Sequence, residues 1–183
     1  MNEDDHTVRS EWMRSVMARY EGPLTRYASR LTGDLDRGRD IVQDTFLRLC
    51  ETEPSNVNGH LAEWLFTVCR NRALDVQRKE SRLKPLDDAK LEVCESTDPS
   101  PSLAAERSET TSLVLKLVES LPANQQEVVL LKFQNGLSYR EISGITKLSV
   151  SNVGFLIHTA IKNLRGQMQQ HVTLAERLER EIS

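Results

Sequence analysis

The sequence predicts an all-α protein with two small helical domains joined by an acidic flexible linker. Apolar residues recur at steps of three and four through most of the 183 residues, which is the period of an amphipathic helix. Aromatic residues make up only 5% of the chain, too few for the strands of a β-sandwich or barrel. Residues 85–102 contain three prolines and several acids, so they should not form a regular element. We therefore expect domains at residues 1–84 and 103–183, with 85–102 as the linker.

The N-terminal domain should contain three helices. The first should break or bend at Gly22-Pro23 and end at Gly33. The third should cover about residues 60–82. Its first half is apolar nearly all round, so Trp64 should be buried, and its second half is basic.

The C-terminal domain contains the pattern of a helix-turn-helix. Ser138 and Glu141 form an S-x-x-E capping box that starts a short helix, and residues 144–148 should form the turn. Ser149 can cap the next helix, which turns small polar side chains outward. Its buried stripe should be Val150, Val153, Ile157, Ala160 or Ile161, and Leu164. The second helix of such a unit can enter a DNA major groove, although a purely structural helical hairpin also fits these residues.

The charge distribution favours nucleic-acid binding more than the net charge of −3 does. Residues 70–84 hold six basic residues against two acidic ones, and residues 132–165 hold five against one. Residues 85–109, between them, hold seven acidic residues against two basic ones. Basic stripes suit phosphate contacts, although cations at the end of a helix also suit its dipole.

Nothing in the sequence indicates an enzyme, a metal site or a cofactor. The four histidines are scattered, and no phosphate loop, dinucleotide fingerprint or nucleophile elbow is present. Cys50 and Cys69 lie on apolar stripes and should be core thiols, whereas Cys94 lies in the linker. No secretory signal or apolar span is evident, so we expect a cytoplasmic protein with no direct membrane insertion.

Residues 20–82 and 113–165 together resemble the extracytoplasmic-function (ECF) sigma factors of RNA polymerase. The resemblance lies in DIVQDTFLRLCE from residue 40, in the Trp64-Leu-Phe helix with Asn71-Arg72, and in the run from Leu121-Pro122 to Ile142. It implies a specificity subunit that binds core RNA polymerase and promoter DNA and is held by an anti-sigma factor. The first domain would bind the polymerase clamp and the −10 element, and the second would bind the −35 element.

The resemblance also assigns roles to individual residues. It assigns core-polymerase binding to Asp40, Gln43, Asp44 and Phe46. It assigns contacts with the −10 element to Asn56, Asn58, Arg70, Asn71, Asp75, Arg78 and Arg82. It assigns contacts with the −35 element to Arg140, Ser151, Asn152, Phe155, His158, Thr159 and Lys162.

The recognition helix departs from the family pattern, in which basic residues commonly follow a threonine. No Lys or Arg lies between Lys147 and Lys162, so we expect weak phosphate contact there and an unusual −35 sequence. One alternative function is a stand-alone helix-turn-helix regulator, which would leave the Trp64 helix and the acidic residues from 40 to 46 unexplained. A small helical enzyme or a signalling adaptor is another.

Overall fold

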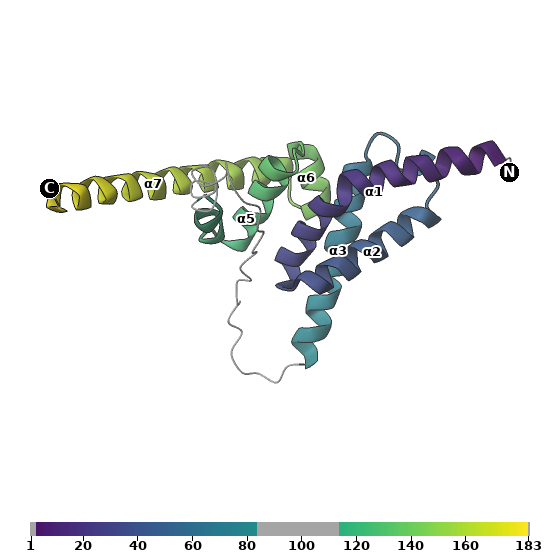
Figure 1. The fold of residues 1–183 in the computed structure, drawn as a ribbon, viewed down its shortest axis with the longest axis horizontal. Helices are drawn as coiled ribbons and strands as arrows, with labels where there is room; N and C mark the ends of the chain where they lie inside the picture. The colour runs from purple at the N-terminus through teal and green to yellow at the C-terminus, as the bar shows by residue number, and fades with distance from the viewer. Residues whose placement is uncertain (1–2, 84–113, 183) are drawn as a thin grey trace. The chain divides into compact units, whose positions relative to one another are not determined.

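The computed structural model describes residues 3–83 and 114–182, and it places the side chains of residues 7–80 and 114–170. Every regular element in these ranges is helical, and the chain forms two compact units, as Figure 1 shows. The prediction of an all-α, two-unit protein is therefore confirmed. The expected linker, residues 85–102, lies outside the described residues, and the domain boundaries stay a prediction.

The N-terminal unit packs three helices around one core. These are α1 (Glu3–Thr32), α2 (Leu35–Glu51) and α3 (Leu61–Leu83), and each contacts the other two. A short 3₁₀ helix, η1 (Pro54–Asn56), lies in the loop before α3. The rings of Tyr27 and Phe66 meet edge to face, with centroids 5.3 Å apart. The buried apolar residues of this unit are Val16, Leu24, Tyr27, Ala28, Ile41, Val42, Phe46, Leu49, Val57, Leu65, Phe66, Cys69 and Ala73.

Helix α1 continues through the expected break. Pro23 lies inside it, and the helix axis changes direction part-way along (Figure 1), so the bend forms and the break does not. The helix ends at Gly33, as predicted. Gly33 has φ +71°, and its backbone N–H donates to the carbonyl of Ser29 over 2.8 Å.

The prediction that Trp64 is buried is wrong. Leu65, Phe66 and Cys69 are at most 1% exposed, whereas Trp64 is only partly buried. Helix α3 packs against α1 and α2 on one side, so a helix that is apolar nearly all round keeps another face outside the core.

The C-terminal unit is a set of short helices packed against one long helix. Residues 114–119 are helical and are followed by α5 (Ala123–Val129), α6 (Tyr139–Thr146) and α7 (Val150–Ile182). Helix α5 packs against α7. The buried apolar residues of this unit are Leu117, Val118, Leu121, Val128, Val129, Leu130, Leu131, Leu137, Ile142, Val153, Leu156, Ile157 and Ala160.

Two details of this unit differ from the expected pattern. Helix α5 passes into one turn of π-helix, η2 (Leu130–Gln134), where the N–H of Asn135 donates to the carbonyl of Leu130 over 3.2 Å. Val150 is 47% exposed because it occupies the first turn of α7, and Leu156 takes a place in the buried stripe instead.

Candidate functional site

The exposed face of α2 carries a short polar row that ends in an apolar side chain. Asp40 and Gln43 are exposed, and Leu47, one turn further along the same face, is 56% exposed. Sequence reasoning missed Leu47, although its spacing of seven residues from Asp40 places it on this face.

Two other residues predicted on α2 have partners within the unit. The Nε atom of Arg72 on α3 donates to Oδ2 of Asp44 over 2.9 Å, so this carboxylate links α2 to α3. Phe46 is only 6% exposed and packs in the core. Its side chain supports α2 from inside, and a direct contact of Phe46 with polymerase stays a prediction.

Helix α3 presents the predicted −10 residues in a row. Asn71, Asp75 and Arg78 are exposed and lie at steps of four and three, so they share one face. Nη1 of Arg78 lies 3.4 Å from Oδ1 of Asp75. Exposed pairs of this kind contribute about 0–1 kcal/mol, so exchanging this one for a phosphate costs little. Arg70 is partly buried, and the side chain of Arg82 lies outside the described residues.

A pocket of about 320 Å³ lies between the loop before α3 and helix α1. Asn58 lines it, whereas Asn56 is exposed but is not part of its wall. Gly59, with φ +82°, makes the turn into α3 that only glycine adopts readily. The lining residues are Trp12, Pro54, Ser55, Val57, Asn58, Gly59 and Leu61.

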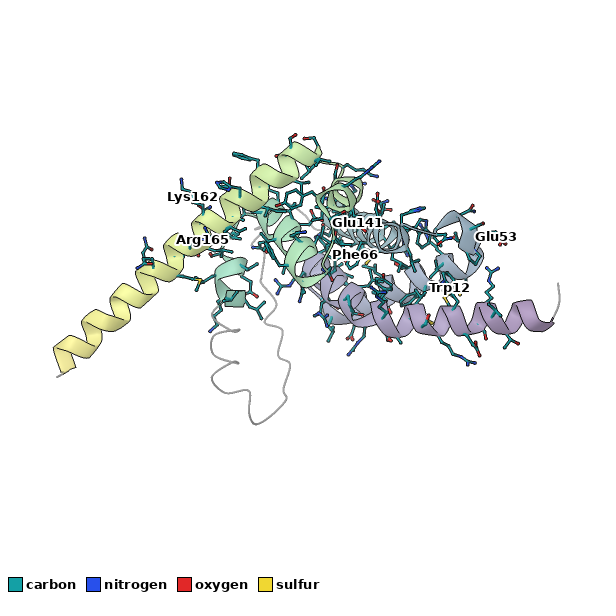
Figure 2. The ribbon with its side chains drawn as sticks, turned by 90° about the horizontal axis from the view of Figure 1, so that it is seen from above. Trp12, Glu53, Phe66, Glu141, Lys162 and Arg165 are labelled. Atoms are coloured by element: carbon teal, nitrogen blue, oxygen red, sulfur yellow. The ribbon has the colours of Figure 1, made fainter. Side chains whose placement is uncertain are left out.

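Trp12, on the first helix, is one of the residues that line this pocket. In the structure Trp12 is partly exposed and lies near the loop that carries Glu53 (Figure 2). Its distance in sequence from residues 54–61 left no local signal for the contact.

The helix-turn-helix forms with the predicted caps. The N–H of Ser138 donates to Oε2 of Glu141 over 2.7 Å, and the N–H of Glu141 donates to Oγ of Ser138 over 3.3 Å. At the start of α7, Oγ of Ser149 accepts from the N–H of Asn152 over 3.2 Å. The turn begins later than predicted, because α6 continues through Thr146 and Lys147 takes the left-handed conformation with φ +63°.

The predicted −35 residues gather on the outward side of α6 and of the first turns of α7. Phe155 is 66% exposed, and Thr159 is partly buried. The exposed members of the set are Arg140, Ser151, Asn152, Phe155, His158 and Lys162. Val153, Ile157 and Ala160 hold the opposite side of α7 in the core. The outward side of the first turns of α7 is therefore accessible to the major groove of DNA.

Within the described residues, no group of three or more His, Cys, Asp or Glu side chains is placed to hold a metal ion. A search of the same residues finds no helix long and apolar enough to cross a membrane.

Comparisons with known proteins agree with this geometry. The family model for Sigma-70 region 2 matches residues 16–83, and that for Sigma-70 region 4 matches residues 111–164. ECF RNA polymerase sigma factor SigE of Mycolicibacterium smegmatis is 27% identical over 171 residues, which are 91% of this chain and 65% of that protein. ECF RNA polymerase sigma factor SigL of Mycobacterium tuberculosis is 29% identical over 165 residues, which are 86% of this chain and 89% of that protein.

A solved structure shares the fold. It is the sigma factor RpoE of Bartonella quintana, crystallised with the anti-sigma factor NepR, with a TM-score of 0.65 at 22% identity over 85% of this chain and 96% of that one. A three-helix unit and a helix-turn-helix unit, matched by Sigma-70 regions 2 and 4, define a transcription initiation factor of the sigma-70 class. Within that class, the chain belongs to the ECF family of RNA polymerase sigma factors.

Proposed function

We propose that this chain binds core RNA polymerase and directs transcription initiation at promoters through the −10 and −35 elements. The observation that carries the proposal is the distribution of exposed polar faces over two units. One unit has separate faces on α2 and α3, and the other has the helix-turn-helix face. A stand-alone helix-turn-helix regulator would need only the last of these.

The α2 face is suited to a protein partner. Asp40 and Gln43 supply a carboxylate and an amide, and Leu47 adds an exposed apolar contact. The carboxylate and the amide complement a basic surface, and the resemblance assigns this segment to the polymerase clamp. Asp44 contributes indirectly, because its pair with Arg72 fixes α2 against α3.

The α3 face and the neighbouring loop are suited to the melted −10 strand. Arg78 can neutralise a phosphate, and Asn71 can pair with a base edge. The pocket before α3 can accept a base that has left the stack, with Asn58 at its wall. Unstacking costs a few kcal/mol, so capture of one base makes melting dependent on sequence.

The helix-turn-helix is suited to the −35 duplex. Asn152 can pair with adenine N6 and N7 in the major groove, and Phe155 can pack on a thymine methyl. Lysine and arginine side chains at either end of this face, including Lys162 and Arg140, would contact phosphates.

We also infer an anti-sigma factor as a partner. The B. quintana sigma factor of the same fold was crystallised with an anti-sigma factor. Exposed apolar side chains such as Leu35, which is 52% exposed, and Leu47 are suited to burial by a protein partner. Core polymerase and its promoters place the action of this chain in the cytoplasm.

Run-off transcription with purified core polymerase on genomic fragments tests the proposal. We expect discrete transcripts when core and this chain are both present and none with core alone. Their start sites would give the −10 and −35 sequences. Absence of transcripts, together with failure to retain the chain on immobilised core, would contradict the proposal. Binding to duplex DNA without binding to core would support the stand-alone regulator instead.

A pair of variants on α2 tests the core-binding face. Asp40→Asn should weaken binding to core by about 1–3 kcal/mol, as expected for loss of a charge contact. Glu21→Gln, which neutralises an exposed carboxylate on α1 away from this row, is the matched control. Asp40 is preferable to Asp44, since a change at Asp44 would also break its pair with Arg72.

A further inference from the structure

Helix α2 ends without the left-handed glycine that commonly terminates a helix. Its C-cap is Thr52, which is extended with φ −93° and ψ +135°. Glu53, the next residue, is also extended, with φ −65° and ψ +131°. Neither residue takes the conformation that would turn backbone N–H groups back towards the last carbonyls of the helix. These carbonyls therefore need other donors.

Three successive carbonyls at this end of α2 receive hydrogen bonds. Oγ1 of Thr52 donates to the carbonyl of Arg48 over 2.8 Å, and the N–H of Thr52 donates to that of Leu49 over 3.1 Å. The third donor comes from α1, where Nη2 of Arg9 donates to the carbonyl of Cys50 over 2.7 Å. Arg9 thus completes the cap of α2 from a position 41 residues earlier in the chain.

Arg9 also holds the start of the loop that follows α2. The same Nη2 atom donates to the carbonyl of Thr52 over 3.3 Å, and Nη1 lies 3.8 Å from Oε1 of Glu53. The side chain of Glu53 is 71% exposed, so water screens this ion pair and the carbonyl contacts matter more. The guanidinium also lies at the negative end of the α2 dipole, where a cation is stabilised.

A second anchor lies in the middle of the loop. Val57 is 1% exposed, and its N–H donates to the carbonyl of Pro54 over 3.2 Å. Asn56 and Asn58, on either side of Val57, are exposed. The positions of these two side chains therefore depend on the buried Val57 and on the point at which the loop leaves α2. Arg9 fixes that point.

The cap comes from a rigid part of the chain that the family match does not include. The region 2 match begins at residue 16, whereas α1 begins at Glu3 and continues without interruption through residue 16. Val16 is 4% exposed and packs in the core. Arg9 is therefore held by a helix that is itself anchored in the unit, two turns before the buried Val16.

We propose that Arg9 is a positioning residue for recognition of the −10 element, because it caps α2 and thereby fixes the loop that carries Asn56 and Asn58. The proposal rests on the proposed function for the role of this loop. It makes the N-terminal turns of α1 a determinant of promoter selectivity without any contact between Arg9 and DNA.

The first test measures the loop in the full chain without polymerase. Arg9→Ala removes the cap, and Arg9→Lys keeps the charge and N–H donors. Arg14→Ala, which removes an exposed charge from the same helix, is the matched control. In Arg9→Ala we expect the NMR order parameters of residues 53–58 to fall from about 0.85 to below about 0.6. Arg9→Lys should restore most of the order, and Arg14→Ala should leave it unchanged.

The second test measures selectivity with core polymerase. The templates carry either the −10 element obtained from the run-off experiment or the same element with its bases changed. Arg9→Ala should reduce the preference for the unchanged element by about 5-fold or more, as expected when a base contact is misplaced. Its retention on immobilised core should stay the same. A purely structural role would lower transcription from both templates by one factor and leave the preference unaltered.

Two results would overturn the proposal. One is equal order parameters of the loop in Arg9→Ala and Arg14→Ala, and the other is an unchanged −10 preference in Arg9→Ala. The proposed function fails separately, if the unsubstituted chain gives no transcripts with core polymerase. The order parameters would then still decide whether Arg9 fixes the loop, because that measurement involves neither polymerase nor DNA.

Discussion

At the scale of single residues, Cys69 shows how burial controls chemistry. The thiol is fully enclosed between α1, α2 and α3. Burial raises the pKa of Cys69 from 9.0 to about 12, and a hydrogen bond with the side chain of Thr45 opposes part of the rise. Because the thiolate is the reactive form, this cysteine should be inert in the folded protein.

Alkylation of the folded chain at pH 8 tests this expectation. Cys50 is exposed and should react readily with iodoacetamide, whereas Cys69 should react only after denaturant is added. Peptide mass spectrometry resolves the two sites. Equal labelling of both in the folded protein would mean that the core around Cys69 opens on the timescale of the reaction.

The raised pKa also has a consequence for stability. The unfolded chain releases the Cys69 proton near pH 9, while the folded chain holds it until about pH 12. The contribution of this group is therefore complete below pH 9 and is lost as the pH rises towards 12. Cys69→Ala should lose this part of the pH dependence, which urea titrations at several pH values would measure.

At the scale of helices, the close contact of α1 with α2 requires a glycine at position 38. Gly38 of α2 is buried against Ser29 of α1. A Cβ at position 38 would lie 2.9 Å from the backbone nitrogen of Ser29, besides meeting its hydroxyl oxygen. Backbone cannot move aside cheaply, so the two helices would have to separate.

Gly38→Ala should therefore lower the free energy of unfolding of the N-terminal unit by about 1–3 kcal/mol. Gly166→Ala, in α7, is the matched control, because a Cβ there would meet nothing within 4 Å. Removing a glycine from a helix at an open position should stabilise it by about 0.5–1 kcal/mol. Denaturant titration followed by tryptophan emission is selective, since Trp12 and Trp64 both lie in this unit. Equal effects of the two variants would contradict the packing argument.

Features fixed by local chemistry were predictable at this scale. The capping box of Ser138 and Glu141 and the helix end at Gly33 follow from side-chain hydrogen bonding and from glycine's conformational freedom. The π-helical turn of η2 and the left-handed Lys147 were not predictable, because tertiary packing selects them over the local preference of the chain. Which face of an apolar helix is covered also depends on the neighbouring helices. Trp64 and Cys50 were both expected in the core, but Trp64 is only partly buried and Cys50 is exposed.

At the scale of the whole molecule, the sequence predicted where the candidate surfaces lie better than which residues belong to them. Order and spacing of motifs predicted the polar row of α2, the face of α3 and the helix-turn-helix. The pocket wall at Trp12 joins residues more than forty positions apart, so it depends on how α1 packs beside the loop before α3. Such features arise from three-dimensional packing and leave no trace in local periodicity.

On the proposed function, the C-terminal unit would separate base reading from charge neutralisation. The exposed face of α7 from Ser151 to Thr159 has no cation, while Lys162 follows on the next turn. A base contact discriminates between sequences by about 1–3 kcal/mol, whereas a phosphate contact strengthens binding to all sequences and steepens its salt dependence. The two kinds of contact should therefore respond differently to substitution.

Asn152→Ala should relax the preference for the −35 sequence and keep the salt dependence of binding. Lys162→Ala should keep the preference and reduce the slope of log K against log salt by about 0.9. Asn163→Ala, on the same helix and about 16 Å beyond Asn152, is the matched control and should leave the preference unchanged. The measurement is a salt series of full-chain binding to a duplex with the −35 element from the run-off experiment and to a scrambled duplex. If Asn152→Ala weakens binding to both duplexes equally, Asn152 contacts the backbone and the bases are read by other side chains of α7.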